Sequence, residues 1–484
     1  MSVSVRSLLL CAGGLLMAGG LPPAHAQSVI ATIGLDDGDP MGIPDNPFGI
    51  TLLPEGTHAL VAISGGFDDP NTGINESNRR VDVIEMDSLS VVGSLQTGFF
   101  PEDIVIATDG AGGTRRIYVT SSGDSSVTVF DGISNPLPVN TIPLPIFSFP
   151  FSAVLSPDES RLFVGTIGGA GDIFVIDADP NSATFETVID TLNVPGGHGR
   201  MAFDGPSRLV VPHSVFAMDF SHADARVTVL DPDNPLDAWS VLLVGGGAFE
   251  YPGAQDCAVS RDGLAWIPVF GGPDDVFVVD VRARDLAAVV DLGPLAEDMQ
   301  HGIALREDDD LAIVTNFVQS TVTFIDTRTR TVVGDLAVGN EPNEVTFSAD
   351  GFLALVTNQN SSTVSVIGGL EPPMFRLSGP GFPALLDSVS FSFDGGEKGR
   401  GVRLLFSVRG NDTSPFESVL VSLTPPIRVR FNGTFDRFGR AATPPANVPD
   451  NPGIVGRSFH LQAVTSYSDG RQVASNAKTL VVQP

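Results

Sequence analysis

A short, largely apolar phrase recurs through most of this chain and in most copies ends in aspartate. It reads Ser-Thr-Val-Thr-Phe-Ile-Asp at 320–326 and Asp-Val-Phe-Val-Val-Asp at 275–280. Seven copies, the first and last of them weaker, end at residues 87, 131, 177, 231, 280, 326 and 368. Their spacing of 42 to 54 residues, carried by short β-branched strands, predicts a β-propeller in which each repeat forms one four-stranded sheet.

Each repeat divides into four predicted strands. In the last repeat, a first strand at 344–347 is followed by the polar turn Ser-Ala-Asp-Gly at 348–351 and a second strand at 353–357. The recurring phrase is the third strand. Because it is apolar almost without interruption, it suits a strand buried on both faces, as in a blade packed between two neighbours. No sustained helical periodicity follows residue 26, so we expect very little helix.

The two ends of the repeat region predict how the ring closes. The seventh repeat stops after its third strand, and the segment Ser-Val-Ile-Ala-Thr-Ile-Gly at 28–34 resembles a fourth strand. We expect this N-terminal segment to complete the last blade, which removes the sheet edge that an open ring would expose. The fold class is therefore all-β: a seven-bladed β-propeller with N-terminal strand closure, followed by a small antiparallel β-sandwich.

The tripeptides Val314-Thr315-Asn316 and Val356-Thr357-Asn358 carry a family resemblance. With the pattern around them they resemble the YVTN-type β-propeller repeats of secreted prokaryotic proteins, within the lactonase-like superfamily. The resemblance covers residues 28–369 and implies a seven-bladed propeller. It implies little about activity, because that fold hosts lactonases, lyases, electron-transfer partners and pure binding modules.

The rest of the chain divides into three parts. Residues 1–26 have a basic start, an apolar stretch and the cleavage signal Ala-His-Ala, so we predict a signal peptide cut after Ala26 and a secreted or periplasmic protein. Residues 27–369 form the propeller, 370–375 a linker, and 376–484 the β-sandwich accessory domain. Beyond the signal the one cysteine is Cys257, in an apolar strand, where we expect a buried, inert thiol.

Charge and hydropathy limit the classes of partner that this chain could bind. Residues 27–370 carry 48 acidic and 14 basic residues, whereas residues 371–484 carry 9 and 12. So acidic a propeller argues against nucleic acid and against anionic membranes. No segment beyond the signal has the length of a membrane span. We expect a monomer whose ligand is a small molecule, a glycan or a protein.

One residue per repeat is expected at the mouth of the central channel, where the first strand of each blade begins. Aligning the repeats gives this ring: Phe48, Glu102, Phe151, His198, Gln255, His301 and Asn343. We predict these seven residues as ligand-binding. His198, His301 and Glu102, with His213 at the end of a neighbouring strand, are candidates for acid–base catalysis because imidazole and carboxylate groups would converge there.

Two connections between second and third strands are long, at 65–76 and 216–224, and both should overhang the channel mouth. The first contains Asp68 and Asp69, whose carboxylates would suit Ca²⁺, but their spacing does not match an EF-hand. Asp177 and Asp231, which follow third strands, are interpreted as turn caps. We assign no metal and no cofactor.

The leading hypothesis is an exported binding module that uses the channel-mouth face. Two alternatives remain open at this point: a propeller lactonase- or lyase-like enzyme using the mouth histidines and Glu102, and a surface-attached structural protein. Binding is preferred over catalysis because no nucleophile motif, P-loop or metal-protease motif occurs in the sequence.

Overall fold

The computed structural model is all-β. It describes residues 27–370, except 36–44, 66–78, 111, 168–170, 219–220, 272–274, 294–298 and 307–309, and beyond them strands β31 to β42 with Thr443. Within these residues the one helical element is η1 (Gln359–Ser361), a single 3₁₀ turn. The predicted signal peptide, the linker beyond residue 370 and the loop with Asp68 and Asp69 lie outside the described residues.

Seven antiparallel sheets make up the propeller, as the repeats predict, and we number the blades in chain order. Blades 1, 2, 3 and 6 are four-stranded meanders that run from the channel outwards. Their strands are β2 (Pro47–Leu52), β3 (His58–Ile63), β4 (Arg80–Glu85) and β5 (Ser90–Gln96); β6 (Pro101–Thr108), β7 (Thr114–Ser121), β8 (Ser126–Phe130) and β9 (Asn140–Pro143); β10 (Pro150–Leu155), β11 (Arg161–Thr166), β12 (Asp172–Asp177) and β13 (Val188–Asn193); and β24 (Gln300–Leu305), β25 (Leu311–Asn316), β26 (Thr321–Asp326) and β27 (Thr331–Ala337).

Blades 4 and 5 differ from the others because their innermost strand is interrupted. Blade 4 consists of β14 (Gly197–His198), β15 (Ala202–Asp204), β16 (Arg208–Phe216), β17 (Ala223–Asp231) and β18 (Asn234–Gly245), and blade 5 of β19 (Gly253–Ala254), β20 (Ala258–Val259), β21 (Leu264–Phe270), β22 (Val276–Asp280) and β23 (Asp285–Val290). The 216–224 connection lengthens β16 and β17 into a long hairpin.

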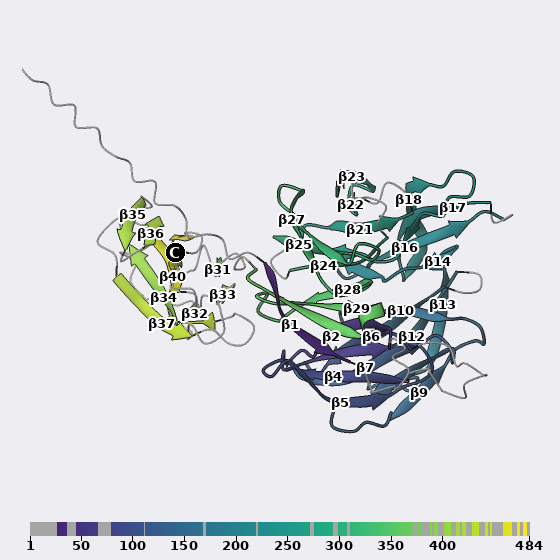
Figure 1. Ribbon diagram of the computed structural model, residues 1–484. Coiled ribbons are helices and arrows are strands. Elements are labelled where there is room, and N and C mark those ends of the chain that lie inside the picture. Colours follow the sequence, from purple (N-terminus) through teal and green to yellow (C-terminus); the bar gives the residue numbers. More distant parts are fainter. Residues whose placement is uncertain are drawn as a thin grey trace, which may run out of the picture.

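Blade 7 confirms the predicted closure. It contains β28 (Pro342–Phe347), β29 (Ala354–Asn358) and β30 (Thr363–Gly368), and β1 (Ser28–Gly34) pairs with β30 as the outermost strand. Figure 1 shows the purple β1 beside the green strands of this blade. The backbone N–H of Leu35 donates to Ser362 O at 2.9 Å just beyond the pairing. The first and last segments of the propeller therefore lock each other in one sheet.

The core lies between the blades. Each pair of neighbouring blades shares one apolar cluster built from both, such as Leu60 of blade 1 with Ile117 and Phe130 of blade 2. These three side chains are fully buried. Because the second and third strands contribute to the clusters on both of their faces, their sequences have the near-continuous apolar character from which the fold was predicted.

The strands beyond residue 370 pair only with one another in the part of this region that the structure describes. The largest sheet has the order β37-β34-β40-β41, and β42 also pairs with β40. The strands are β31 (Arg376–Ser378), β32 (Ser388–Val389), β33 (Ser392–Asp394), β34 (Gly401–Ser407), β35 (Thr413–Phe416), β36 (Val419–Ser422), β37 (Arg428–Thr434), β38 (Ala441–Ala442), β39 (Ala446–Asn447), β40 (Ser458–Ser466), β41 (Gln472–Ala474) and β42 (Lys478–Val481). All their pairings are antiparallel, as predicted for this region.

No helix in the described residues is long and apolar enough to cross a bilayer.

Candidate functional site

The predicted mouth ring maps onto the innermost strands. Six of its members lie in β2, β6, β10, β14, β24 and β28, and Gln255 follows β19 directly. Proline opens four of these strands, at Pro47, Pro101, Pro150 and Pro342. The loops that reach these strands, together with the connections between second and third strands, form one face of the propeller, which we call the mouth face.

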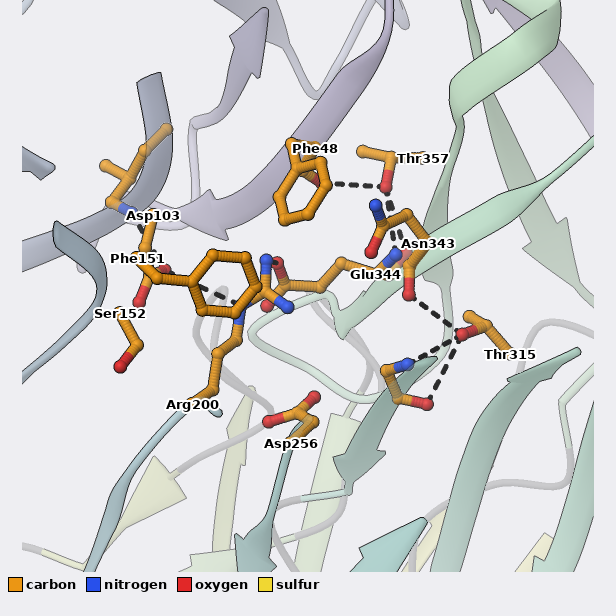
Figure 2. Close-up of polar contacts among 12 residues, drawn as sticks. Phe48, Asp103, Phe151, Ser152, Arg200, Asp256, Thr315, Asn343, Glu344 and Thr357 are labelled. Carbon is orange, nitrogen blue, oxygen red and sulfur yellow. Dashed lines mark hydrogen bonds and ion pairs between the residues drawn. The ribbon is translucent and has the colours of Figure 1, made fainter. Parts of the chain in front are cut away.

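Arg200, rather than a histidine, occupies the middle of the channel (Figure 2). Its side chain is buried, and Nη2 lies 2.7 Å from Glu344 Oε2 while Nε lies 3.9 Å from Asp103 Oδ1. The guanidinium carbon is 5.4 Å from the ring centre of Phe48 and 5.7 Å from that of Phe151, and the two rings meet edge-on. Groups from blades 1, 2, 3 and 7 thus meet one cation from blade 4.

More carboxyls than cations surround this centre. Burial acts to lower the pKa of Arg200, but Glu344, Asp103, Asp256 and Glu102 together hold it above its usual value. Burial raises the pKa of Glu102 to about 7, against the opposing effect of a hydrogen bond from the Ser122 hydroxyl at 2.8 Å. It raises the pKa of Asp256 to about 7 and that of Glu344 well above its usual range. Near neutral pH the cluster therefore retains protons, because one guanidinium cannot compensate four buried carboxylates.

Two of these carboxylates also tie neighbouring blades together. Asp103 Oδ2 accepts the backbone N–H of Ala153 in blade 3, and Asp256 Oδ2 accepts that of Ile303 in blade 6, each at 2.9 Å. Their other oxygens accept N–H groups within their own blades. The centre of the channel is a bonded polar hub that holds the inner strands in place.

His198 and His213 come together as predicted, but their ring nitrogens bond to the protein. They are cross-strand partners in blade 4 and are 1% and 2% exposed. His198 Nε2 is 2.7 Å from Val194 O, and its Nδ1 accepts from the Thr166 backbone N–H at 3.2 Å. Burial lowers the pKa of His198 and lowers that of His213 to about 4. Both imidazoles are neutral at physiological pH and their ring nitrogens are engaged.

His213 fills the structural place that asparagine takes in the regular blades. Its Nε2 is 2.9 Å from Thr228 Oγ1 on the third strand of blade 4. Asn316 Nδ2 donates to Thr323 Oγ1 at 2.9 Å in the same way in blade 6. The register agrees, since Thr228 pairs with Val211 and Thr323 with Val314, in each case two residues before the side chain concerned. His213 is thereby explained by the fold.

His301 stands apart from the other two histidines. Its ring stacks on Phe317 with centres 4.5 Å apart and planes 11° apart, and Phe270 lies at 6.1 Å. The side chain is 8% exposed, and neither ring nitrogen makes a well-formed hydrogen bond with the described residues. Burial and the charge of Arg200 lower the pKa of His301 to about 4, against the opposing effect of Asn343. It is a neutral imidazole within hydrogen-bonding reach of Asn343, so at least one of its two nitrogens has no partner among the described residues.

Exposed apolar side chains gather on the mouth-face loops of blades 3 to 5. We call this set the apolar patch: Ile146, Phe147, Phe149, Ile167, Phe216, Met218, Phe249 and Tyr251. Phe147 and Phe249 are 72% and 81% exposed. Both have a positive φ, 65° and 67°, which is rare for a bulky residue. The backbone here holds large apolar side chains in solvent at a conformational cost, which is a feature of functional loops.

The charged side chains at the centre of the channel lie one or two positions after the predicted ring residues, and Arg200 follows His198 by two. Asp103, Asp256 and Glu344 each follow a predicted ring residue directly, and Gly49, Gly199 and Gly302 occupy the same position in other blades. A Cβ at Gly49 would lie 2.4 Å from the backbone oxygen of Glu102. Blade 3 has Ser152 there, whose hydroxyl donates to Gly199 O at 2.8 Å. The position is thus glycine, where inner strands touch, or a polar side chain that reaches the hub or the next inner strand. This alternation was visible in the sequence.

The remaining predictions concern single groups. Cys257 is free and buried, as predicted, and burial raises its pKa well above the usual value. Asp177 and Asp231 cap their own turns by accepting the N–H of the residue two positions on. Among the described residues, no three His, Cys, Asp or Glu side chains are grouped so that they could hold a metal ion.

Comparison with known proteins identifies the fold alone. No family model and no curated protein matches the chain. Among solved structures 817 chains match, so the architecture is common. One of them, hydrazine synthase of Kuenenia stuttgartiensis, is 17% identical with a TM-score of 0.55, and the match covers 67% of this chain and 96% of that one. At this identity the likeness extends to the propeller arrangement and not to the activity.

Proposed function

We propose that this protein is an exported recognition module that binds a protein partner through the apolar patch on its mouth face. The observation that carries the proposal is the exposure of Phe147, Phe249 and Met218 on neighbouring loops of one face. Exposed apolar groups of this size, concentrated on one side, mark interaction sites in soluble proteins. The signal peptide predicted at residues 1–26 supports export.

Contacts between the loops support a preformed surface. Phe216 and Tyr251 lie 6.3 Å apart and come from different connections. The N–H of Phe249 donates to Ser221 O at 2.8 Å, and the N–H of Ala223 donates to Glu250 O at 3.0 Å. The long hairpin of blade 4 is thus bonded to the loop that leads into blade 5. A partner would meet a surface with little ordering cost.

Charge indicates what kind of partner fits. The mouth-face loops of blades 3 to 5 contain no lysine or arginine, whereas Glu250 is exposed beside Phe249. The whole chain has a formal net charge of −30. We therefore propose a partner whose surface combines an apolar centre with basic residues around it, because such a surface would be attracted to this face. A second copy of this acidic face, or an anionic lipid surface, would be repelled.

The catalytic alternative has less support from the geometry. A general base needs a titratable group free to reach a substrate, and the ring nitrogens of His198 and His213 are engaged with protein groups. His301 is buried, and burial lowers its pKa to about 4, which makes it a weak base near neutral pH. Glu102 titrates near neutral pH, but its position beside Ser122 and Arg200 links it to the buried hub.

A photo-crosslinking residue in place of Phe249 tests the proposal in the cells that produce the protein, with Leu236 as the matched control position. Leu236 is 96% exposed but lies at the start of β18, just after the connection between third and fourth strands on the opposite face. We expect a protein adduct at position 249 and none at 236. The adduct protein, once purified, should bind Phe147→Ser/Phe249→Ser about 10-fold or more weakly than the parent.

The Leu137→Ser/Leu236→Ser double variant should bind like the parent, and binding should weaken with added salt. Equal adducts at both positions, adducts only with lipid or with a second copy of the chain, or an unchanged affinity of the Phe147→Ser/Phe249→Ser variant would each overturn the proposal.

A further inference from the structure

We propose that the channel mouth between blades 5 and 7 holds a second site, which binds a small uncharged molecule through the imidazole of His301. The ligand would combine a hydroxyl or amide group with an apolar body. This site is separate from the apolar patch and rests on other observations.

Unbonded nitrogens are the first of these observations. Buried polar groups in folded proteins are almost always hydrogen-bonded, so a buried imidazole without a partner calls for an explanation. His301 is more than nine-tenths buried, and neither ring nitrogen makes a well-formed hydrogen bond within the described residues; Asn343 can satisfy at most one of them. The nitrogens of His198 and His213, at comparable burial, are bonded. Within the described residues His301 therefore differs from the other two histidines, and we assign its missing partner to a bound molecule.

The surroundings of His301 define the polar part of the ligand. A neutral imidazole offers one N–H donor and one acceptor nitrogen, and burial with the nearby Arg200 keeps His301 neutral at physiological pH. Asn343 of blade 7, which is 1% exposed, lies within hydrogen-bonding reach of the imidazole and acts to raise its pKa. Hydroxyl and amide groups both donate and accept, so they complement this pair.

Charge around the site excludes ionic ligands. The environment that keeps the imidazole unprotonated would also disfavour a bound cation. An anion would meet the carboxyls of Glu344, Asp256 and Glu102 around Arg200, whose single positive charge they already offset. An uncharged ligand avoids both costs.

Aromatic rings define the apolar part. Phe317 stacks on the imidazole, and Phe270 from blade 5 lies on the same ring at 6.1 Å. These rings offer no hydrogen bonds, so ordered water would satisfy the nitrogens but gain nothing from the rings. An organic molecule with an apolar body can use both kinds of surface, which favours it over water.

Four probes of similar size test the inference by ligand-observed saturation-transfer NMR on the purified protein. Benzamide and benzyl alcohol are uncharged near pH 7.5, whereas benzoate and benzylamine carry opposite charges. We expect saturable binding of the two uncharged probes at millimolar concentration and at least about 10-fold weaker binding of the charged ones, because each must be desolvated without a counter-charge.

His301→Phe keeps the aromatic stack and removes the nitrogens, so it should bind benzamide at least about 10-fold more weakly. His301→Gln, which restores a donor and an acceptor, should recover part of the binding. Phe249→Ser, in the apolar patch, should bind benzamide like the parent, so this outcome is independent of the protein-binding proposal. Should His301→Phe fail to fold, the imidazole ¹⁵N resonances of His301 in the parent protein decide, since benzamide should shift them.

Three outcomes overturn the inference: no binding of either uncharged probe, equal binding of charged and uncharged probes, or undiminished binding by a folded His301→Phe. The inference also fails if crystals soaked with benzamide show density only for ordered water at the ring nitrogens of His301.

Discussion

Blades 6 and 7 differ from blades 4 and 5 in how their inner strands are attached to the rest of the ring. In blade 6 the hydroxyl of Thr315 accepts the N–H of Gly302 at 2.8 Å and donates to Asn343 O of blade 7 at 2.8 Å. Thr357 of blade 7 links Glu344 N and Phe48 O in the same manner. One threonine thus connects two blades, which gives the Val-Thr-Asn tripeptide a structural purpose.

Blades 4 and 5 have proline at that position, Pro212 and Pro268, and no hydroxyl to make the link. There the backbone makes the connection itself: Gly199 N donates to Pro212 O, and Arg200 N donates to Gln255 O of blade 5, both at 2.8 Å. The inner strands are interrupted, and the interruption of blade 4 brings Arg200 into the channel. The regular blades preserve the ring, while the irregular ones supply its central cation and much of the apolar patch.

Arg200→Met breaks this comparison at its centre and should have the largest effect. It would leave the carboxyls of Glu344, Asp103 and Asp256 buried without their cation, which costs about 3 to 5 kcal/mol of unfolding free energy in comparable buried clusters. Urea unfolding followed by tryptophan fluorescence measures it. The two tryptophans of the chain, Trp239 and Trp266, lie in blades 4 and 5, so the signal reports on the propeller.

Arg161→Met serves as the control. Arg161 pairs with the exposed Asp233 at 2.8 Å, and its loss should cost less than about 1 kcal/mol. Equal destabilisation by the two variants would show that Arg200 does not hold the inner strands.

Thr315→Val tests the threonine link and should have the second-largest effect. The variant keeps the shape but leaves the buried N–H of Gly302 and the carbonyl of Asn343 without their partner, at a cost of about 1 to 3 kcal/mol. Thr315→Ser retains the hydroxyl and should recover most of the loss. If Thr315→Val unfolded at the parent's urea concentration, the bonds seen at Thr315 would carry no net stability.

The propeller was predictable because its determinants are local and repeated. The third strands, the turns and the missing last strand of blade 7 all follow from periodic patterns, and the pairing of Ser28–Gly34 with β30 followed from the incomplete repeat. The roles of the side chains, in contrast, could be assigned only from the three-dimensional structure. An aligned position tells which residues begin an inner strand, but the bonding of His213 to Thr228 depends on a register that the sequence does not state.

The candidate site was predictable only in part, for the same reason. The ring members Phe48, Phe151 and His301 do lie at the channel, but Arg200, paired with Glu344, dominates it because it carries a positive charge into a buried space. The apolar patch was not predicted, because Phe147 and Phe249 lie in loops whose sequences do not repeat from blade to blade. Whether the predicted ring binds a ligand stays a prediction, which the His301 probes address.

His213→Asn sharpens the comparison by giving blade 4 the side chain of the regular blades. Because asparagine bridges to the third strand at this position in blade 6, the unfolding free energy at pH 7.5 should change by less than about 1 kcal/mol. His213→Leu cannot bridge and should cost about 1 to 3 kcal/mol. If both variants lost the same unfolding free energy, His213 and Asn316 would share a position in their blades but not a structural role.

His213 also has a pH signature. The folded-state pKa of about 4 lies below the unfolded value of 6.5, so the unfolded chain takes up a proton first as pH falls. The stability that depends on neutral His213 is full above pH 6.5 and is lost as pH falls from 6.5 to about 4. His213→Asn should make this loss smaller, which urea unfolding at pH 7 and pH 5 would show as a reduced difference.

Glu102→Gln addresses the carboxyl at the edge of the hub and should have the smallest effect. Burial raises the folded pKa of Glu102 to about 7, above the usual 4.5, so within this window the folded protein holds a proton that the unfolded chain has released. This group therefore lowers stability as pH rises from 4.5 to about 7 and has no further effect above that range. It opposes the effect of His213 over the same pH window, so the parent's own pH profile cannot separate the two effects.

Comparing Glu102→Gln with the parent separates them. The unfolding free energy of Glu102→Gln relative to the parent should increase from pH 5 to pH 8. Asp131→Asn, which changes an exposed carboxylate of the same blade, serves as the control, and its unfolding free energy relative to the parent should stay constant. A relative stability of Glu102→Gln that stayed flat with pH would mean that Glu102 is ionised throughout, and that the hub holds its protons on Asp256 and Glu344 instead.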